Sequence, residues 1–287
     1  MAAFTCSLTG NSVLANWRQT VLSITMLPQD LPESDTRLLV TMTGEPIQPV
    51  RLYYRIPSRA YVVMRLRSLG SVNKVPQSGE WEWLYHSETR GLQFGPRSYA
   101  EVPEEVQPIV LGRIRFPKKA GMRIDVRSVS RAIEAARFFG PILGPKVVAT
   151  RARILNRLSR ATLGPPEAID RELDRNVTAI DPAKAERKLE QILRGVRTME
   201  DAERRLAASL NKLRNSGEDV PSVEDFPLVP EEETPEFGHL TATLNVRFIR
   251  AWEHYKGNTH LTLAEIIVRS VEQDHSSSKC TDVAPRS

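Results

Sequence analysis

Cysteine is scarce in this chain, which has only Cys6 and Cys280 among its 287 residues. Two cysteines near opposite ends provide neither a disulfide framework nor the paired spacing of a zinc site. Their scarcity fits a reducing compartment, and we expect a cytoplasmic protein. Of the few histidines, His254 and His260 lie six residues apart and do not share a helix face. We therefore expect no bound metal.

Long apolar runs and the common catalytic motifs are also missing. No run of 18 or more apolar residues occurs, so we expect no helix that crosses a membrane. The segment from Gly140 to Gly144 lacks the Gly-Lys-Ser/Thr ending of a phosphate-binding loop. No Gly-x-Ser-x-Gly nucleophile motif is present. We expect no cofactor and favour a non-enzymatic protein, while a catalytic site formed only by tertiary contacts stays an open alternative.

Positive charge, in contrast, is abundant in residues 113–160. This segment holds thirteen basic and two acidic residues, a net charge of +11 in a chain whose net charge is +5. The basic residues are Arg113, Arg115, Lys118, Lys119, Arg123, Arg127, Arg131, Arg137, Lys146, Arg151, Arg153, Arg157 and Arg160. Such a cluster indicates an anionic partner, and nucleic acid is the partner class that an arginine-rich face fits best.

The first part of the basic segment predicts a hairpin. In residues 106–116 and 122–126, apolar side chains alternate with arginines, which is the pattern of a strand with one buried and one wet face. Residues 131–139 and 146–160 predict two helices, the second with Arg153, Arg157 and Arg160 on one exposed face. A helix-turn-helix motif is the less favoured interpretation, because the connection is too long and contains two prolines.

Three aromatic residues, Trp81, Trp83 and Tyr85, alternate in a short stretch that predicts a strand. A strand places all three on one face. That face is either a packed part of the core or a platform on which bases stack, and we favour the core because large aromatic side chains usually dominate it.

The rest of the chain has the opposite charge and predicts helices. Residues 167–236 carry 18 acidic and 11 basic residues. A heptad pattern starts at Leu189 and indicates a coiled coil or a helical hairpin, against the alternative of an amphipathic helix packed on its own domain. Residues 216–236 are acidic and proline-rich, which predicts a linker and, as a weaker hypothesis, a segment that folds over the basic surface.

These patterns predict an α+β fold, with an N-terminal, mostly antiparallel sheet and two or three helices followed by a helical, possibly coiled-coil region. The predicted division is an α+β domain at 1–165 with the basic segment at 113–160, a helical region at 166–215, a linker at 216–236, C-terminal helices at 237–273 and a disordered tail at 274–287. The first 29 residues form either an arm or strand, or a targeting segment.

Two functional hypotheses follow, beside the plainer interpretation that the arginines form a solvated face with local ion pairs. The first is a nucleic-acid-associated protein that binds the phosphate backbone of DNA or RNA through Arg113, Arg115, Arg123, Arg127, Arg151, Arg153, Arg157 and Arg160. The second is a scaffold or regulatory subunit that binds a protein partner, or forms a homodimer, through residues 189–213. Its predicted contacts are Ile192, Val196, Met199, Leu206, Leu210 and Leu213.

Overall fold

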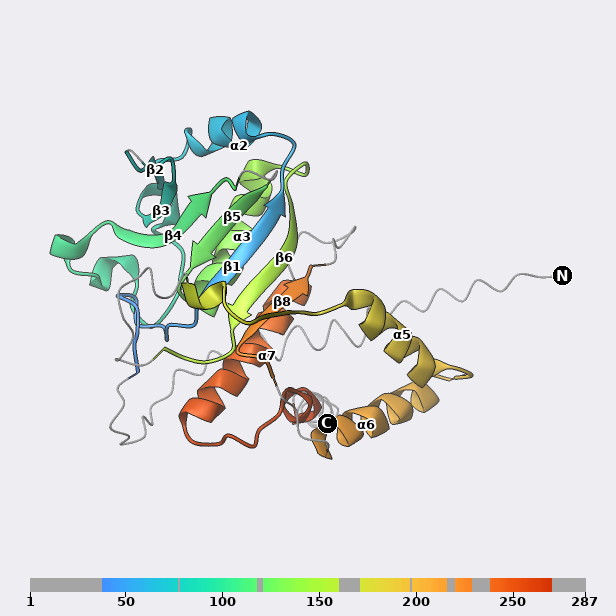
Figure 1. The fold of residues 1–287 in the computed structure, drawn as a ribbon. Helices are drawn as coiled ribbons and strands as arrows, with labels where there is room; N and C mark the ends of the chain where they lie inside the picture. The colour runs from blue at the N-terminus through green and yellow to red at the C-terminus, as the bar shows by residue number, and fades with distance from the viewer. Residues whose placement is uncertain are drawn as a thin grey trace, which may run out of the picture.

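A computed structural model describes residues 38–76, 78–117, 121–159, 171–196, 198–215, 220–228 and 238–269. Its main feature is one eight-stranded sheet with the strand order β2-β3-β4-β5-β1-β6-β8-β7 (Figure 1). The strands are β1 (Val50–Arg55), β2 (Val72–Lys74), β3 (Trp81–Tyr85), β4 (Ile109–Arg115), β5 (Met122–Val126), β6 (Val148–Leu155), β7 (Val177–Ala179) and β8 (Val223–Pro227). Neighbouring strands are antiparallel except β7 and β8, which are parallel, so the sheet is mixed.

Helices lie along and around this sheet. They are α2 (Arg59–Leu66), α3 (Val129–Leu143), α5 (Pro182–Leu193), α6 (Met199–Asn215) and α7 (Gly238–Tyr255), with short 3-10 turns η1 (Ser87–Thr89), η2 (Tyr99–Glu101) and η3 (Glu104–Val106). Residues 263–269 are also helical. The helix α3 begins where the Ser128 side chain accepts a hydrogen bond from the backbone N–H of Arg131, as an N-cap does.

The core lies between the sheet and α3, and α7 packs beside α3. Val50, Leu52 and Tyr54 of β1 are buried on this side, as are the alternate positions of β5. Trp83 belongs to the same core and contacts the rings of Phe138 and Phe139. The prediction that the alternating aromatics are core residues is confirmed, because Trp81, Trp83 and Tyr85 are all buried. The opposite face of the sheet carries polar residues and is turned toward the viewer in Figure 1.

The expected order of an α+β domain followed by a separate helical, coiled-coil region is wrong. Strands β7 and β8 come from the acidic, supposedly helical part of the chain, and they continue the sheet beyond β6. Helices α5 and α6 are short and lie between these two strands in the sequence, where they contact one another as a hairpin. The heptad pattern was therefore the signature of two amphipathic helices interrupted near Gly195, whose φ of +75° ends the helical path.

Two local predictions differ from the structure for the same reason. Residues 146–160 were expected to form a helix, but Val148–Leu155 is strand β6, which pairs with β1 on one side and β8 on the other. Strand β8 lies within 216–236, where the sequence indicated an acidic linker. Pairing across a sheet joins segments far apart in the chain, so it can override a helical pattern in either one.

The described residues contain no helix that is both long and apolar enough to cross a membrane. The same part of the chain contains no cluster of three or more side chains suited to hold a metal ion. Residues 1–37, 160–170 and 270–287 lie outside the described structure, so the predictions of an N-terminal arm and a disordered tail concern residues that the structure does not describe.

Candidate functional site

The polar face of the sheet is organised in two rows of side chains that run across the strands. The first, which we name the central row, follows the strand register from β3 to β8. Its members are Glu82, Arg113, Asp125, Arg51, Arg153 and Asp225. The three arginines and the three acids balance, so the row has no net charge.

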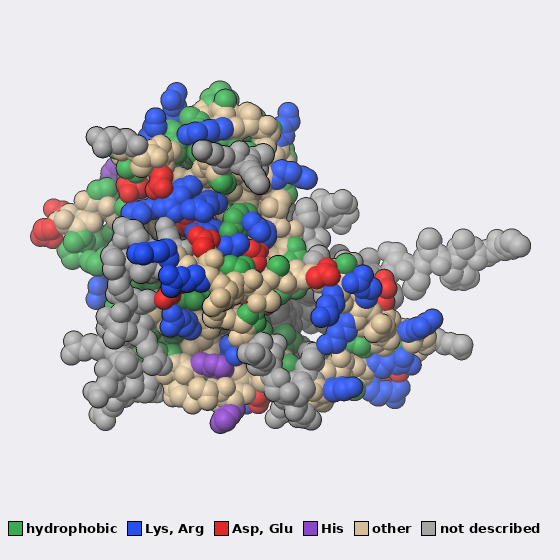
Figure 2. All heavy atoms as spheres, in the orientation of Figure 1, with side chains coloured by type: hydrophobic (Ala, Val, Ile, Leu, Met, Phe, Trp, Pro, Cys, Tyr) green, Lys and Arg blue, Asp and Glu red, His purple; other side chains and the backbone are tan. Residues whose placement is uncertain are grey.

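The second row, which we name the arginine row, lies two residues further along the same strands. It consists of Arg115 of β4, Arg123 of β5, Tyr53 of β1 and Arg151 of β6. No acidic residue lies in the row between Arg115 and Arg151, and Glu80, which precedes β3, flanks its β4 end. Figure 2 shows Lys and Arg side chains gathered over these strands with acidic side chains beside them.

Ion pairs hold the central row together. Arg51 is only 1% exposed, and its guanidinium donates to Asp125 and, at 2.6 Å, to Asp174. Asp174 also accepts from Arg153 at 2.9 Å, and Arg153 in turn donates to Asp225 at 2.8 Å. Burial alone lowers the pKa of Arg51, but the neighbouring Asp125 carboxylate raises this pKa above its ordinary value. From Asp125 to Asp225 the central row is thus a network of paired charges, whereas Arg113 forms no salt bridge with any residue that the structure describes.

The arginines of the arginine row form ion pairs with acids that lie outside the row. Arg115 pairs with Glu80 at 2.6 Å and with Asp125 at 3.1 Å, and Asp125 lies 3.3 Å from Arg123. Because Asp125 also pairs with Arg51, one carboxylate serves three guanidinium groups. Arg123 therefore has only a shared acid for its guanidinium group.

Arg151 occupies the most exposed place in the arginine row. Its side chain is 45% exposed and pairs at 3.2 Å with Asp225, which Arg153 already engages. The Arg151 guanidinium lies 3.9 Å from the centre of the Tyr53 ring. This cation–π contact holds the guanidinium group over the Tyr53 ring.

The structure brings together five of the eight arginines predicted to bind nucleic acid: Arg113, Arg115, Arg123, Arg151 and Arg153. Arg127 follows the end of β5 and is exposed. Arg157 follows β6 and pairs with Glu172 at 2.9 Å. Arg160 lies outside the described residues. Arg153 and Arg157 do not share a helix face, because Arg153 is in a strand and Arg157 is beyond its end.

Sequence reasoning missed two central members of this face, Arg51 and Tyr53. The signal was present, because Arg51, Tyr53 and Arg55 alternate with the apolar Val50 and Leu52 in an extended segment. It also missed that Arg131 lies away from the polar face. Arg131 is 2% exposed and pairs at 2.6 Å with the equally buried Glu45.

The residues predicted to mediate oligomerisation lie on the hairpin of α5 and α6. Ile192 is in α5, Val196 follows it, and Leu206 is in α6, and all three are partly buried. Met199, Leu210 and Leu213 are in α6, but their side chains are outside the described structure. Each of the six residues stays a predicted oligomerisation contact.

Comparison with known proteins does not assign a role to this face. No protein family, curated protein or solved structure matches the chain. The geometry of the two rows is therefore the basis for a function.

Proposed function

We propose that the protein binds the phosphate backbone of nucleic acids through the arginine row. The observation that carries this proposal is the placement of three arginines across four adjacent strands with no acid among them. Neighbouring strands lie about 4.8 Å apart, so the row extends over roughly 15 Å. That length suits several consecutive phosphates of one strand.

The chemistry of the row supports backbone contact. A guanidinium group presents paired donors that match phosphate oxygens, and Arg115, Arg123 and Arg151 are partly or largely exposed. Such contacts orient the backbone and do not read bases. Tyr53 lies between the two halves of the row and adds an aromatic edge. Arg127 and Arg157 flank the face, whereas Arg153 serves the internal network.

The predicted arginines have different roles in nucleic-acid binding. Arg115, Arg123 and Arg151 contact phosphate, and Arg127 and Arg157 add long-range attraction from exposed positions. Arg113 does not belong to the arginine row and is not one of the phosphate contacts. Binding to nucleic acid in the cytoplasm is part of this proposal, and the choice between DNA and RNA is decided by the experiment.

The test is binding of the purified protein to labelled single-stranded DNA, duplex DNA and RNA across a salt series, measured by fluorescence anisotropy. The variant is Arg115→Gln, Arg123→Gln and Arg151→Gln combined. Each neutralised phosphate contributes about 0.7 to 0.9 to the slope of log affinity against log salt, so the variant slope should fall by roughly 2 to 2.7.

A matched control removes the same charge elsewhere. Arg187, Arg204 and Arg269 are 67%, 79% and 58% exposed and lie off the sheet face. Their combined replacement by Gln should leave the slope nearly unchanged. Equal losses in both triple variants would mean that only net charge matters, and no binding of the parent protein at low salt would refute the proposal.

A second candidate function is docking of a protein partner, or of a second copy, on the α5–α6 hairpin. The observation that favours it is that these helices pack chiefly on each other. A helix as short as the 12 residues of α5 is marginal by itself, so a partner would stabilise the hairpin. Sedimentation of a Leu206→Asp variant tests this candidate: a parent dimer that becomes a monomer supports self-association, and a monomeric parent removes it.

A further inference from the structure

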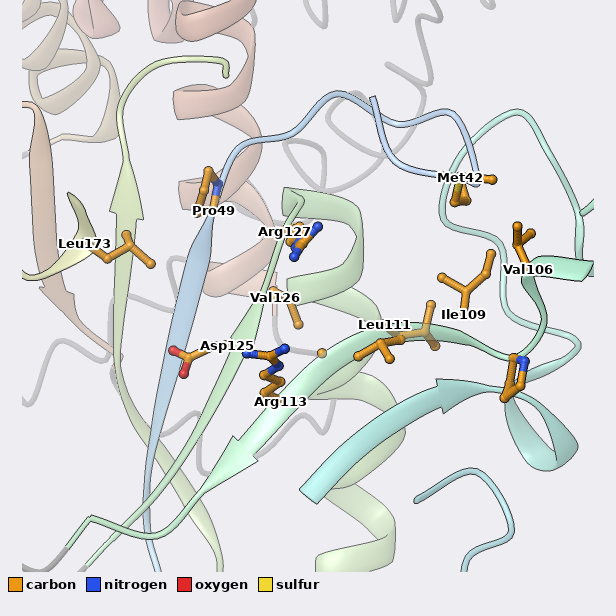
Figure 3. A pocket seen from close by; sticks show the side chains of 13 residues that line it. Met42, Pro49, Val106, Ile109, Leu111, Arg113, Asp125, Val126, Arg127 and Leu173 are labelled. Atoms are coloured by element: carbon orange, nitrogen blue, oxygen red, sulfur yellow. The ribbon is translucent and has the colours of Figure 1, made fainter. Parts of the chain in front are cut away.

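A pocket lies at the end of the sheet where β4 and β5 meet the segment before β1. Its volume is about 350 Å³. Met42, Val106, Ile109 and Leu111 form one side, Leu173 lies at the other, and Arg113 is between them (Figure 3). This end of the face is apart from the arginine row, so the inference below goes beyond the proposed function.

The pocket gathers apolar side chains that the protein leaves exposed. The described residues include five exposed large apolar side chains, and Met42, Val106 and Val110 line this one pocket. They are 42%, 42% and 38% exposed. Scattered exposed apolar residues are ordinary, but a group around one hollow indicates a surface that a ligand covers.

Arg113 supplies a cation to the pocket. It lies opposite Asp125 and Glu82 in the strand register, but it forms no salt bridge with any residue that the structure describes. The Asp125 carboxylate, which also lines the pocket, is taken by Arg51, Arg115 and Arg123. Arg127 adds a second positive charge to the lining. The pocket therefore favours an anionic group near Arg113.

Hydrogen bonds from the buried Arg131 hold the apolar side of the pocket in place. Strand β4 has an irregularity at Leu111, because Trp83 is opposite Gly112 and Leu84 is opposite Val110. Arg131 donates to the carbonyl oxygens of Val110 and Leu111 at 3.2 and 3.5 Å.

The same guanidinium anchors the opposite rim. Arg131 pairs with Glu45, and Glu45 belongs to the turn that carries Met42. One buried ion pair thus fixes both β4 and the Met42 turn, and the pocket is formed before any ligand arrives.

We propose that this pocket binds a small amphipathic anion, with its acidic group on Arg113 and its apolar body against Met42, Val106 and Leu111. A guanidinium group recognises a carboxylate or a phosphate through the same pair of donors. A volume of about 350 Å³ leaves room for a ligand of roughly ten non-hydrogen atoms.

Calorimetric titration with octanoate and with 1-octanol tests the proposal, because the two probes share an apolar body and differ in charge. Octanoate should bind with a Kd below about 1 mM, and octanol should bind at least about tenfold more weakly. The Arg113→Gln variant should lose at least about tenfold in octanoate affinity and keep its octanol affinity. Val106→Asp should weaken both probes, because it places a charge on the apolar rim.

The Arg113→Gln variant should keep the stability of the parent protein. Arg113 has no salt bridge within the described structure, so its replacement leaves no buried acid unpaired, and the Tm should match that of an Arg204→Gln control. The Arg151→Gln variant of the arginine row should still bind octanoate, because Arg151 pairs with Asp225 and not with Asp125 of the pocket lining, and this separates the site from the nucleic-acid proposal. Equal binding of octanoate and octanol, undiminished octanoate binding by Arg113→Gln, or no binding at millimolar octanoate would each overturn the proposal.

Discussion

The central row and the arginine row use the same strands and nearly the same residue types, yet they differ in what their charges do. In the central row, Arg51 and Arg153 are almost enclosed by Asp125, Asp174 and Asp225. In the arginine row, two residues away, Arg123 and Arg151 share acids that already have partners, and Arg115 has Glu80 beside the shared Asp125. Arginine content alone therefore does not define a binding surface, because the supply of carboxylates decides which arginines remain available.

The comparison also changes the meaning of the +11 segment. On the polar face, Arg51, Arg113, Arg115, Arg123, Arg151 and Arg153 stand against Glu80, Glu82, Asp125, Asp174 and Asp225. Most of these acids come from outside residues 113–160. Charge that looks concentrated along the sequence is thus largely neutralised on this face of the sheet.

The largest expected effect concerns Arg131, which is 2% exposed and pairs with Glu45. Arg131→Met leaves the buried Glu45 carboxylate without its cation, and this should cost about 3–5 kcal/mol in the free energy of unfolding. Urea denaturation measures the change. Arg137→Gln is the matched control from the same helix, where Arg137 is 44% exposed and pairs with Glu134, and it should cost less than about 0.5 kcal/mol. Similar losses in the two variants would contradict the ranking by burial.

The next largest effect is the difference in stability loss between variants of two arginines of strand β6. Arg153 is 13% exposed and donates to two carboxylates, so Arg153→Gln should cost about 1–3 kcal/mol of stability. Arg151 is exposed and shares its acid, so Arg151→Gln should cost less than about 0.5 kcal/mol. Urea denaturation of both variants makes the comparison. A larger loss for Arg151→Gln would break the distinction between the two rows.

The pH dependence of stability tests the contribution of Glu45 to the buried Arg131–Glu45 pair. Burial would raise the pKa of Glu45, but the Arg131 charge and hydrogen bonds from Thr41 and Thr43 outweigh it, so this pKa lies below its ordinary value. A lowered pKa in the folded state stabilises the fold above the unfolded pKa of about 4.3, and this contribution is lost as the pH falls below it. The stability difference between the parent and Glu45→Gln should therefore shrink between about pH 5 and pH 3. A constant difference over this range would contradict the assignment.

The smallest expected effect is a change in polyanion affinity when one negative charge beside the central row is removed. Asp174 is 52% exposed and bridges Arg51 and Arg153. Asp174→Asn should raise the affinity for polyanions roughly twofold, because a unit charge at about 10 Å in water contributes about 0.4 kcal/mol. Anisotropy titration at low salt measures the change. Weaker binding would show that Asp174 orients the arginines that contact the ligand.

The sequence predicted those parts of the fold that depend on local alternation. The β4–β5 hairpin and the buried aromatics of β3 were expected, because period-two patterns there agree with the sheet. Strands β6 and β8 were not expected, since VATRARIL also fits a helix and VEDFP resembles a loop. Their conformation is decided by pairing with β1 and with each other.

The site was predictable to a similar extent. Charge density identified Arg115, Arg123 and Arg151, and it overlooked Arg51 and Tyr53 because they lie far away in the sequence. No sequence pattern indicated that Asp174 and Asp225 would pair with Arg153. The availability of a charge depends on tertiary neighbours, which composition does not show.

The most direct test of the two-row account is the salt dependence of nucleic-acid binding by Arg151→Gln and Arg153→Gln. Both variants remove one positive charge from strand β6, two residues apart. The account predicts that Arg151→Gln lowers the slope of log affinity against log salt by about 0.7 to 0.9, and that Arg153→Gln leaves it nearly unchanged. Equal slopes for the two variants, or a parent protein that does not bind at low salt, would contradict it.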